Sequence, residues 1–501
     1  MRLALSILLA LLTLHAASAQ DYVPRDERGS LDARAQTDLD GNRAVATVYN
    51  FGQSGRTGGF SDQVPYEWPA GTRQHYLALT GLLVGAEVES ETGAPAAIVN
   101  IPKYRENPND PDRAWTWIPV PEYQGGGEIA RSDRPETWPA VWPDRLGDAS
   151  DPGWPGAWNG LLGKDAIIDG VETYTHYTDD QYDRNRQSPA TTYIPDATEP
   201  DRAGLGLVVA ERRLAFQEPA GQDAHFAVRD IYNAGTQDLT GVGAALWIAD
   251  LVGGDPDAQD DVVLVDRARR LILFTDADGE SPDPAFGGEP VSAAALVLLE
   301  TPDAGGFANV QLRPAGGVNF QSTSDQTLFD SFLAPADFPD PEPSTGDDDT
   351  FAAVGLFDLA AGASARLATA LVFSDVDYTS DDFETRYAEL IGKAEAARLF
   401  YADGFVVAGE GGAEAVGLDL GVAPNPARET ARIRFSVPTA QAARLDVIDA
   451  LGRRVATLAD GAYAAGSHAA EWNAASAAPG VYLLRLRAAD GVATRTMTVA
   501  R

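Results

Sequence analysis

Five aspartates crowd into the segment "DLVGGDPDAQDD", namely Asp250, Asp255, Asp257, Asp260 and Asp261. Carboxylate and carbonyl oxygens are the ligands that calcium prefers, and a turn rich in Asp and Gly offers both. Adjacent carboxylates also repel one another unless a cation or salt relieves them. The segment therefore predicts a Ca²⁺ site, and Ca²⁺ is the one cofactor for which the sequence offers candidate ligands.

Three further acidic loops share this composition: "TDLDGN" (37–42), "TDADGESPD" (275–283) and "STGDDDT" (344–350). None of the four loops completes the twelve-residue EF-hand pattern, which needs a further ligand, a glycine and a distal glutamate. Asp, Gly and Pro are also the usual residues of solvated turns, so solvation is the simpler interpretation of each loop taken alone.

Carboxylates could also support glycoside hydrolysis, which needs two of them and benefits from aromatic surfaces that contact sugar. Six tryptophans between residues 115 and 158 could provide those surfaces: Trp115, Trp117, Trp138, Trp142, Trp154 and Trp158. Tryptophan is also the largest core residue, and "WPAVWP" and "GWPGAW" are typical of loops that pack on themselves. Packing is the favoured interpretation, and no pair among the 74 acidic residues stands out as catalytic.

Other common catalytic patterns are missing from the sequence. His75, His176, His225 and His468 are far apart and show no metal-ligand spacing. The chain has no cysteine, which excludes thiol nucleophiles, cysteine-ligated zinc and disulfides. Neither G-x-S-x-G nor H-E-x-x-H occurs. The sequence thus predicts no catalytic and no cofactor-binding residue, and we expect a protein that is not an enzyme.

The charge is strongly negative, with 38 basic against 74 acidic residues and a formal net charge of −36. Nucleic-acid binding is disfavoured because neutralising phosphates needs clustered positive charge. The acids are spread along the whole chain, which favours a role in solubility over one in dedicated cation binding.

The elements that would position these residues are mainly β-strands. In 239–250 the even-numbered Val242, Ala244, Leu246 and Ile248 share one face, and Ala245 and Trp247 share the other. The segment 261–279 predicts a hairpin, and 380–402 predicts one amphipathic helix with Thr379 and Ser380 available as N-caps. Its apolar stripe is Phe383, Tyr387, Leu390, Ile391, Ala394 and Ala397. We expect a β-sandwich-like body with long Trp/Pro/Gly-rich loops.

The N-terminus of the chain has the pattern of an export signal. Residues 1–19 have a basic residue, a short apolar run and "ASA", the layout of a secretory signal peptide too short to anchor in a membrane. The expected domains are the signal peptide (1–19), a β-rich body (20–408, with a sub-boundary near 195–204 as an option), a linker (409–419) and a C-terminal module (420–501). No other stretch is apolar for long enough to span a bilayer, so no transmembrane segment is expected in the mature chain.

The C-terminal module, hereafter the tail, holds short alternating runs separated by Gly, Pro and Asp turns, which predicts a small antiparallel sandwich. Its core would contain Leu445, Val447, Ile448, Tyr482, Leu484 and Leu486. The runs "PNPARETARIRFSVP", "LDVIDALGRRVATL", "AAGSHAAEWNA" and "APGVYLLRLRA" resemble, in order and position, the C-terminal sorting domain of type IX secretion substrates. An ordinary β-sandwich accessory module is the alternative.

This resemblance implies an immunoglobulin-like fold and handling by the type IX secretion machinery. It also implies removal of the tail, with the cargo released or joined to lipopolysaccharide at the cell surface. Within the body, "TVYNFG", "YEWPAGT" and "RPETWPAVWPDRLGDASDPGWPGAWNGLLGKDA" resemble segments of other secreted bacterial proteins with the same tail, a group without an assigned activity. We expect a secreted or surface-attached, non-catalytic structural or binding protein. The alternative is a secreted polysaccharide hydrolase.

Overall fold

The computed structural model describes two parts of the chain. In the first part these are residues 28–56, 62–108, 110, 113–143, 153–336 and 344–405. In the tail they are 419–423, 430–437, 441–449, 453–463, 466–474, 477–478, 480–488 and 491–499. The expected signal peptide and almost all of the expected linker lie outside these residues. The chain divides into two compact units, Met1–Ala397 and Arg398–Arg501, and each is treated by itself below.

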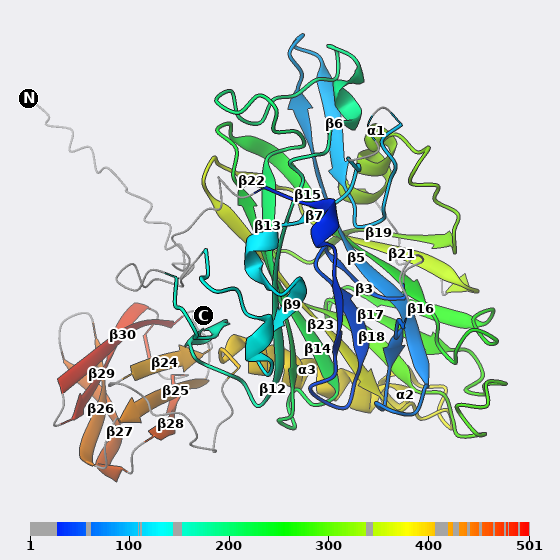
Figure 1. The fold of residues 1–501 in the computed structure, drawn as a ribbon. Helices are drawn as coiled ribbons and strands as arrows, with labels where there is room; N and C mark the ends of the chain where they lie inside the picture. The colour runs from blue at the N-terminus through cyan, green and yellow to red at the C-terminus, as the bar shows by residue number, and fades with distance from the viewer. Residues whose placement is uncertain are drawn as a thin grey trace, which may run out of the picture. The chain divides into compact units, whose positions relative to one another are not determined.

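The first unit is a sandwich of two large antiparallel sheets (Figure 1). Sheet 1 has the order β1 (Gln36–Leu39), β2 (Ala46–Tyr49), β3 (Gln53–Gly55), β5 (His75–Glu89), β15 (Leu239–Asp250), β21 (Asp348–Val354) and β19 (Phe307–Pro314). Three strands pair beside this path: β4 (Tyr66–Glu67), β6 (Pro95–Asn100) and β22 (Phe357–Leu359).

Sheet 2 faces sheet 1 across the core. Its order is β20 (Ser344–Thr345), β16 (Asp261–Asp266), β17 (Leu271–Asp276), β18 (Ala293–Glu300), β23 (Ser364–Ser374), β14 (Ala224–Asn233), β13 (Leu207–Phe216), β12 (Gly170–Thr178), β9 (Glu128–Arg131) and β8 (Gln124–Gly125), with β7 (Ile118–Pro119) beside β12. A small ribbon joins β10 (Asn159–Gly160) and β11 (Gly163–Lys164). The predicted hairpin over 261–279 is confirmed as β16 and β17.

The alternation expected in β15 is confirmed by burial. Val242, Ala244, Leu246 and Ile248 lie in the main core between the sheets, together with residues from both sheets. Ala245 and Trp247 lie on the outer face of sheet 1, where α1 (Asp325–Leu328) and the π-helical turn η5 (Phe329–Leu333) cover them. The two faces of one strand therefore bury apolar residues in two separate cores.

The outer face of sheet 2 is covered by the tryptophan-rich segment. Trp142, Trp154 and Trp158 are at most 2 % exposed and pack on Tyr174 and Val208 of this sheet. The segment includes the short 3-10 turns η2 (Pro121–Tyr123) and η3 (Pro135–Thr137); η1 (Leu31–Ala33) and η4 (Arg184–Gln187) lie elsewhere in the unit. Packing, the favoured interpretation of these aromatic residues, is what their burial supports.

The predicted helix is present in two pieces, α2 (Phe383–Arg386) and α3 (Ala388–Ala402). Tyr387 departs from helical geometry at φ −109° and ψ 18°, and this single residue separates the end of α2 from the start of α3. Most of the predicted stripe faces inward: Tyr387, Leu390, Ala394 and Ala397 are buried, and Phe383 and Ile391 are partly buried.

The N-cap differs from the sequence-based expectation. Asp382 caps the helix by accepting from the Thr385 N–H at 3.0 Å, because its carboxylate is one residue from the first helical position. Asp382→Ala should lower the free energy of unfolding by about 1 kcal/mol, measured by urea denaturation. Ser380→Ala is the matched control and should change it by less than about 0.5 kcal/mol. A larger effect at Ser380 than at Asp382 would contradict this assignment.

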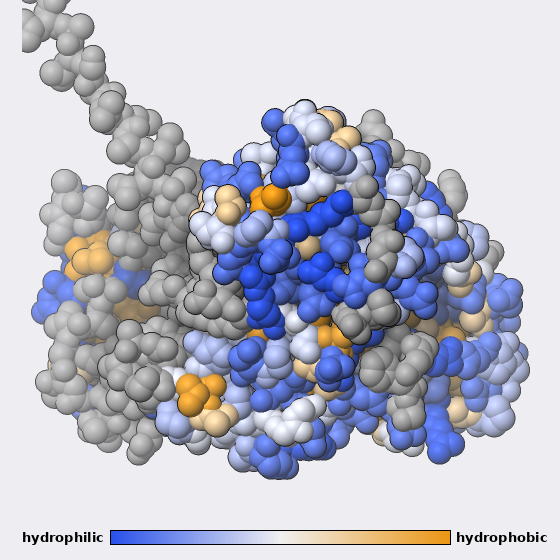
Figure 2. Space-filling model, turned by 45° about the horizontal axis from the view of Figure 1, so that its top comes forward, coloured by the Kyte–Doolittle hydropathy of each residue, from blue (hydrophilic) through white to orange (hydrophobic). Residues whose placement is uncertain are grey.

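The surface of the molecule suits its acidic composition. The face in Figure 2 is mostly hydrophilic, and apolar residues form only small separate groups on it. Large exposed apolar side chains among the described residues of the body are scattered over several loops and strands, including Tyr104, Val141, Leu162, Ile167 and Leu356. Single exposed apolar residues are ordinary on soluble surfaces, so exposure alone assigns none of these residues to a site.

The described residues of the tail form a second, smaller sandwich. One sheet contains β24 (Asp419–Ala423), β25 (Thr430–Val437) and β28 (Gly466–Asn473); the other contains β27 (Arg454–Tyr463), β26 (Gln441–Asp449), β29 (Gly480–Ala488) and β30 (Gly491–Val499). Both sheets contribute to a core of their own. Five of the six predicted core residues belong to this core; Ile448 is buried at 5 % exposure but lies outside it. The tail therefore has the apolar interior that an independently folding module needs.

Candidate functional site

The five aspartates of 250–261 separate into different environments. Asp250, the last residue of β15, and Asp261, the first of β16, are each 1 % exposed. Asp255 is turned away, and its two oxygens accept from the Arg56 guanidinium at 2.6 and 2.8 Å. Asp257 and Asp260 meet Asp276, the last residue of β17. The sequence-predicted set is thus not one cluster.

Asp257, Asp260 and Asp276 form what we call the acidic centre. One carboxylate oxygen from each lies within 4.8 Å of the other two. Asp276 belongs to a different acidic loop, 275–283, and sequence reasoning treated the two loops separately. The signal that could have joined them is the predicted hairpin, since pairing of β16 with β17 sets Asp261 opposite Asp276.

Crowding and burial raise the pKa values of these carboxyls. The pKa of Asp257 is raised to about 6 and that of Asp276 to about 7, first by burial and then by the neighbouring negative charges. The adjacent pair shows the same effect: burial first, and repulsion by neighbouring carboxylates next, raises the pKa values of Asp250 and Asp261. The region holds more negative charge than its own hydrogen bonds relieve.

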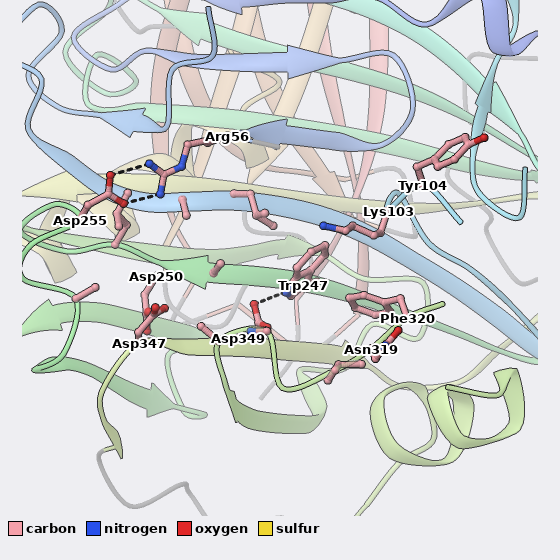
Figure 3. Close-up of a pocket in the computed structure, with 18 of the residues that line it drawn as sticks. Arg56, Lys103, Tyr104, Trp247, Asp250, Asp255, Asn319, Phe320, Asp347 and Asp349 are labelled. Carbon is pink, nitrogen blue, oxygen red and sulfur yellow. Dashed lines mark hydrogen bonds and ion pairs between the residues drawn. The ribbon is translucent and has the colours of Figure 1, made fainter. Parts of the chain in front are cut away.

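A groove of about 600 Å³ opens beside this region (Figure 3). Its lining comes from β5, the end of β15 and the loops around residues 104, 255, 319 and 347. In the view of Figure 3 the Arg56–Asp255 pair lies at one end and Tyr104 at the other, with Trp247 and Phe320 between them. The groove combines aromatic rings with acidic and basic side chains.

Trp247 and Asp349 form the floor of the groove. The Trp247 Nε1–H donates to Asp349 Oδ1 at 2.7 Å, and the Gly316 N–H donates to Asp349 Oδ2 at 3.0 Å. The ring of Trp247 packs on Phe320, with ring centroids 5.0 Å apart. Tyr104 is 43 % exposed, and the Arg34 guanidinium lies 5.6 Å from its ring centroid, so the ring is only partly covered and can also contact a ligand.

The charges of the groove are mainly negative. Asp250, Asp255, Asp347 and Asp349 line it against Arg56 and Lys103. The hydrogen bonds from Arg56 lower the pKa of Asp255, whereas burial first, and neighbouring carboxylates next, raise the pKa of Asp347. Arg56 is engaged by Asp255, which leaves the carboxylates of Asp347 and Asp349 in the lining together with the ammonium of Lys103.

The histidines and the six tryptophans of 115–158 take no part in the groove. His225 is 5 % exposed and its Nε2 lies 3.1 Å from the Ala44 carbonyl oxygen. His176 stacks on Tyr123 with ring centroids 3.5 Å apart, and burial lowers its pKa. Among the residues that line the groove, the one tryptophan is Trp247. The sequence placed it on the face of β15 opposite Leu246 but did not associate it with a site.

The tail carries the decisive similarity to known proteins. Residues 421–500 match the family described as the secretion system C-terminal sorting domain. The tail is a type IX sorting domain. The sorting domain implies delivery to the extracellular space or to the outer surface of the outer membrane. None of the described helices is long and apolar enough to cross a membrane.

No curated protein matches this chain. Among solved structures, a polysaccharide lyase is similar at 10 % identity and a TM-score of 0.21, over 59 % of this chain and 34 % of that one. A putative kojibiose phosphorylase from human microbiome is similar at 9 % identity and 0.27, over 73 % and 34 %.

A third solved structure, dimeric latent PorU from Porphyromonas gingivalis, is similar at 11 % identity and a TM-score of 0.16, over 66 % of this chain and 31 % of that one. This chain thus spans about a third of the length of each of these three proteins. Likenesses this weak carry no conclusion about the body, and its resemblance to other secreted proteins stays a prediction.

Proposed function

We propose that the body is a non-catalytic binding protein whose groove holds a neutral or amino-bearing oligosaccharide outside the cell. The observation that supports this is the exposed ring of Tyr104 in the same groove as several carboxylates. Sugar hydroxyls donate to carboxylates, and the apolar face of a sugar packs on an aromatic ring. The acidic lining would repel a polyuronate.

The rigidity of the groove floor favours binding. Trp247 and Asp349 are already hydrogen-bonded and buried, so little side-chain freedom is lost there when a ligand enters. The groove of about 600 Å³ is also within the usual size range for a small-molecule site.

Calorimetry with a neutral glucan oligosaccharide, a chitin oligosaccharide and a polyuronate of equal length tests the proposal. We expect the first two to bind and the polyuronate not to bind. Tyr104→Ala should weaken binding about tenfold, or about 1.4 kcal/mol, because it removes the exposed ring. Leu162→Ala, which removes a comparably exposed side chain elsewhere in the body, is the control and should leave affinity unchanged. Preference for the polyuronate, or equal affinity of the Tyr104 variant, would contradict the proposal.

A secreted polysaccharide hydrolase is the second candidate, and one observation favours it. Asp250 and Asp255 line the same groove with pKa values pushed apart, the first raised by burial and the second lowered by its hydrogen bonds from Arg56. Such a pair is typical of an acid and its ionised partner. Asp250, however, is 1 % exposed and Asp255 is held by two bonds from Arg56, which places hydrolysis second. Release of reducing ends that disappears in Asp255→Asn would favour the hydrolase and contradict a non-catalytic role.

The route outside the cell forms part of the proposal. Residues 1–19 direct passage across the inner membrane and are removed. The sorting domain then engages the type IX machinery, and the body is released or joined to lipopolysaccharide on the cell surface. Support for this route comes from the signal-like composition of the N-terminus together with the family match of residues 421–500.

A further inference from the structure

The acidic centre joins two segments that are separate in the sequence. Asp257 and Asp260 belong to the loop between β15 and β16, and Asp276 ends β17. Among the described residues, no lysine or arginine forms an ion pair with any of these three carboxylates. Three acids therefore converge without a basic partner.

A second observation concerns hydrogen bonds within the acidic centre. Asp276 is fully buried, and its Oδ1 accepts from the Asp278 N–H at 3.0 Å. Its Oδ2 has no hydrogen-bond partner, and neither does Oδ2 of Asp257, which is 8 % exposed. A buried carboxylate oxygen without a partner is costly, and a bound cation would satisfy it.

The span of the acidic centre fits one ion. Two oxygens on opposite sides of a Ca²⁺ ion are about 4.8 Å apart, twice a bond length of about 2.4 Å, so carboxylate oxygens no farther apart than this can contact the same Ca²⁺ ion. The acidic centre has its three oxygens within 4.8 Å of one another. It offers oxygen ligands only, whereas zinc sites use mainly nitrogen and sulfur.

The geometry points to a Ca²⁺ site at Asp257, Asp260 and Asp276. Asp261, which follows Asp260 and pairs with Asp276, is next to the site. The carboxylates supply up to six oxygens if each is bidentate, and water completes the coordination. The site differs from the sequence prediction because Asp255 pairs with Arg56 and Asp276 takes its place.

The ion would fasten the loop of 251–260 to the end of β17. Leu251, Ala258 and Gln259 of this loop line the groove, so the ion also holds one wall of the proposed saccharide site. In this respect the inference deepens the proposed function. The ion site itself needs no saccharide, and the two can fail separately.

Thermal unfolding of the chelator-treated mature chain tests the site. At ~10 mM CaCl₂, at least ten times the ~0.1–1 mM dissociation constants of extracellular calcium modules, we expect the Tm to rise by roughly 2–6 °C over NaCl of equal ionic strength. Calorimetric titration of CaCl₂ into the same protein should show one site.

Asp276→Asn should abolish both the shift and the titration signal, and Asp257→Asn gives a second measurement should Asp276→Asn fail to fold. Glu280→Gln is the matched control, because it removes an exposed charge from the same loop as Asp276 and should retain the full shift. A wild-type Tm that responds equally to NaCl and CaCl₂, or a full Ca²⁺ shift in both Asp variants, would overturn the inference. Neither readout involves a saccharide, so failure of saccharide binding leaves the result interpretable.

Discussion

Glu211→Ala is expected to lower the free energy of unfolding of the body by about 3–5 kcal/mol. Glu211 of β13 is 1 % exposed in the interior of the sandwich and forms ion pairs with Arg213 and Arg229. Tyr177 donates to its Oε2 at 2.6 Å. Removing this carboxylate leaves two buried guanidinium groups without their anion, which is the costly way to break a buried ion pair.

The contacts of Glu211 also extend to the other sheet through Arg213, which adds to the free energy lost when Glu211 is removed. Nη1 of Arg213 donates to the hydroxyl of Ser54 at 2.8 Å, and Ser54 lies in β3 of sheet 1. Urea denaturation of the wild type and the variant measures the effect. The control is Glu384→Gln, which breaks the exposed pair of Glu384 with Arg269 and should cost no more than about 1 kcal/mol.

The pH dependence follows from the same contacts. Burial alone would raise the pKa of Glu211, but the charges of Arg213 and Arg229 outweigh it and hold the pKa below its ordinary 4.5. Its stabilising contribution is therefore complete above pH 4.5 and is lost as the pH falls through the lowered folded value. Stability below pH 4.5 should fall more steeply in the wild type than in Glu211→Ala. If the free energy of unfolding of Glu211→Ala lies within 1 kcal/mol of the wild-type value at neutral pH, Glu211 is not the buried anion on which Arg213 and Arg229 depend.

The spacing of apolar residues along the sequence predicted which face of a strand or helix is buried. The two faces of β15, the stripe of Leu390, Ala394 and Ala397, and the tail core around Leu445 and Leu484 all follow from spacing alone. The break at Tyr387 and the cap at Asp382 did not follow, because more than one residue near the helix start could serve as its cap.

The candidate sites could not be predicted in full because they depend on long-range strand pairing. Arg56 meets Asp255 because β3 pairs with β5 and β5 with β15, whose end leads into the loop that holds Asp255. Asp276 meets Asp257 and Asp260 because β17 returns beside β16; the sequence predicts this hairpin, but not the pairing of residues that sets Asp261 opposite Asp276. A single sequence shows which acids are near each other along the chain, and not which acids meet across a sheet.

The tail makes the second prediction with a large effect. Its core shares no residue with the cores of the body, and the chain divides into units near residue 397. A chain truncated after residue 419 should therefore keep the thermal unfolding of the body and lose its export label. The truncated protein is expected to accumulate inside the cell envelope, because the sorting domain matched at 421–500 is absent.

The most direct measurement of this account is the location of the full-length and truncated chains in a bacterium with a type IX secretion system. Immunoblots of cells, outer membrane and medium should show the full-length protein at the surface or in the medium. The truncated protein, although folded, should be retained in the periplasm. Equal amounts of both proteins outside the cell would contradict the assignment of residues 420–501 as the segment that directs delivery.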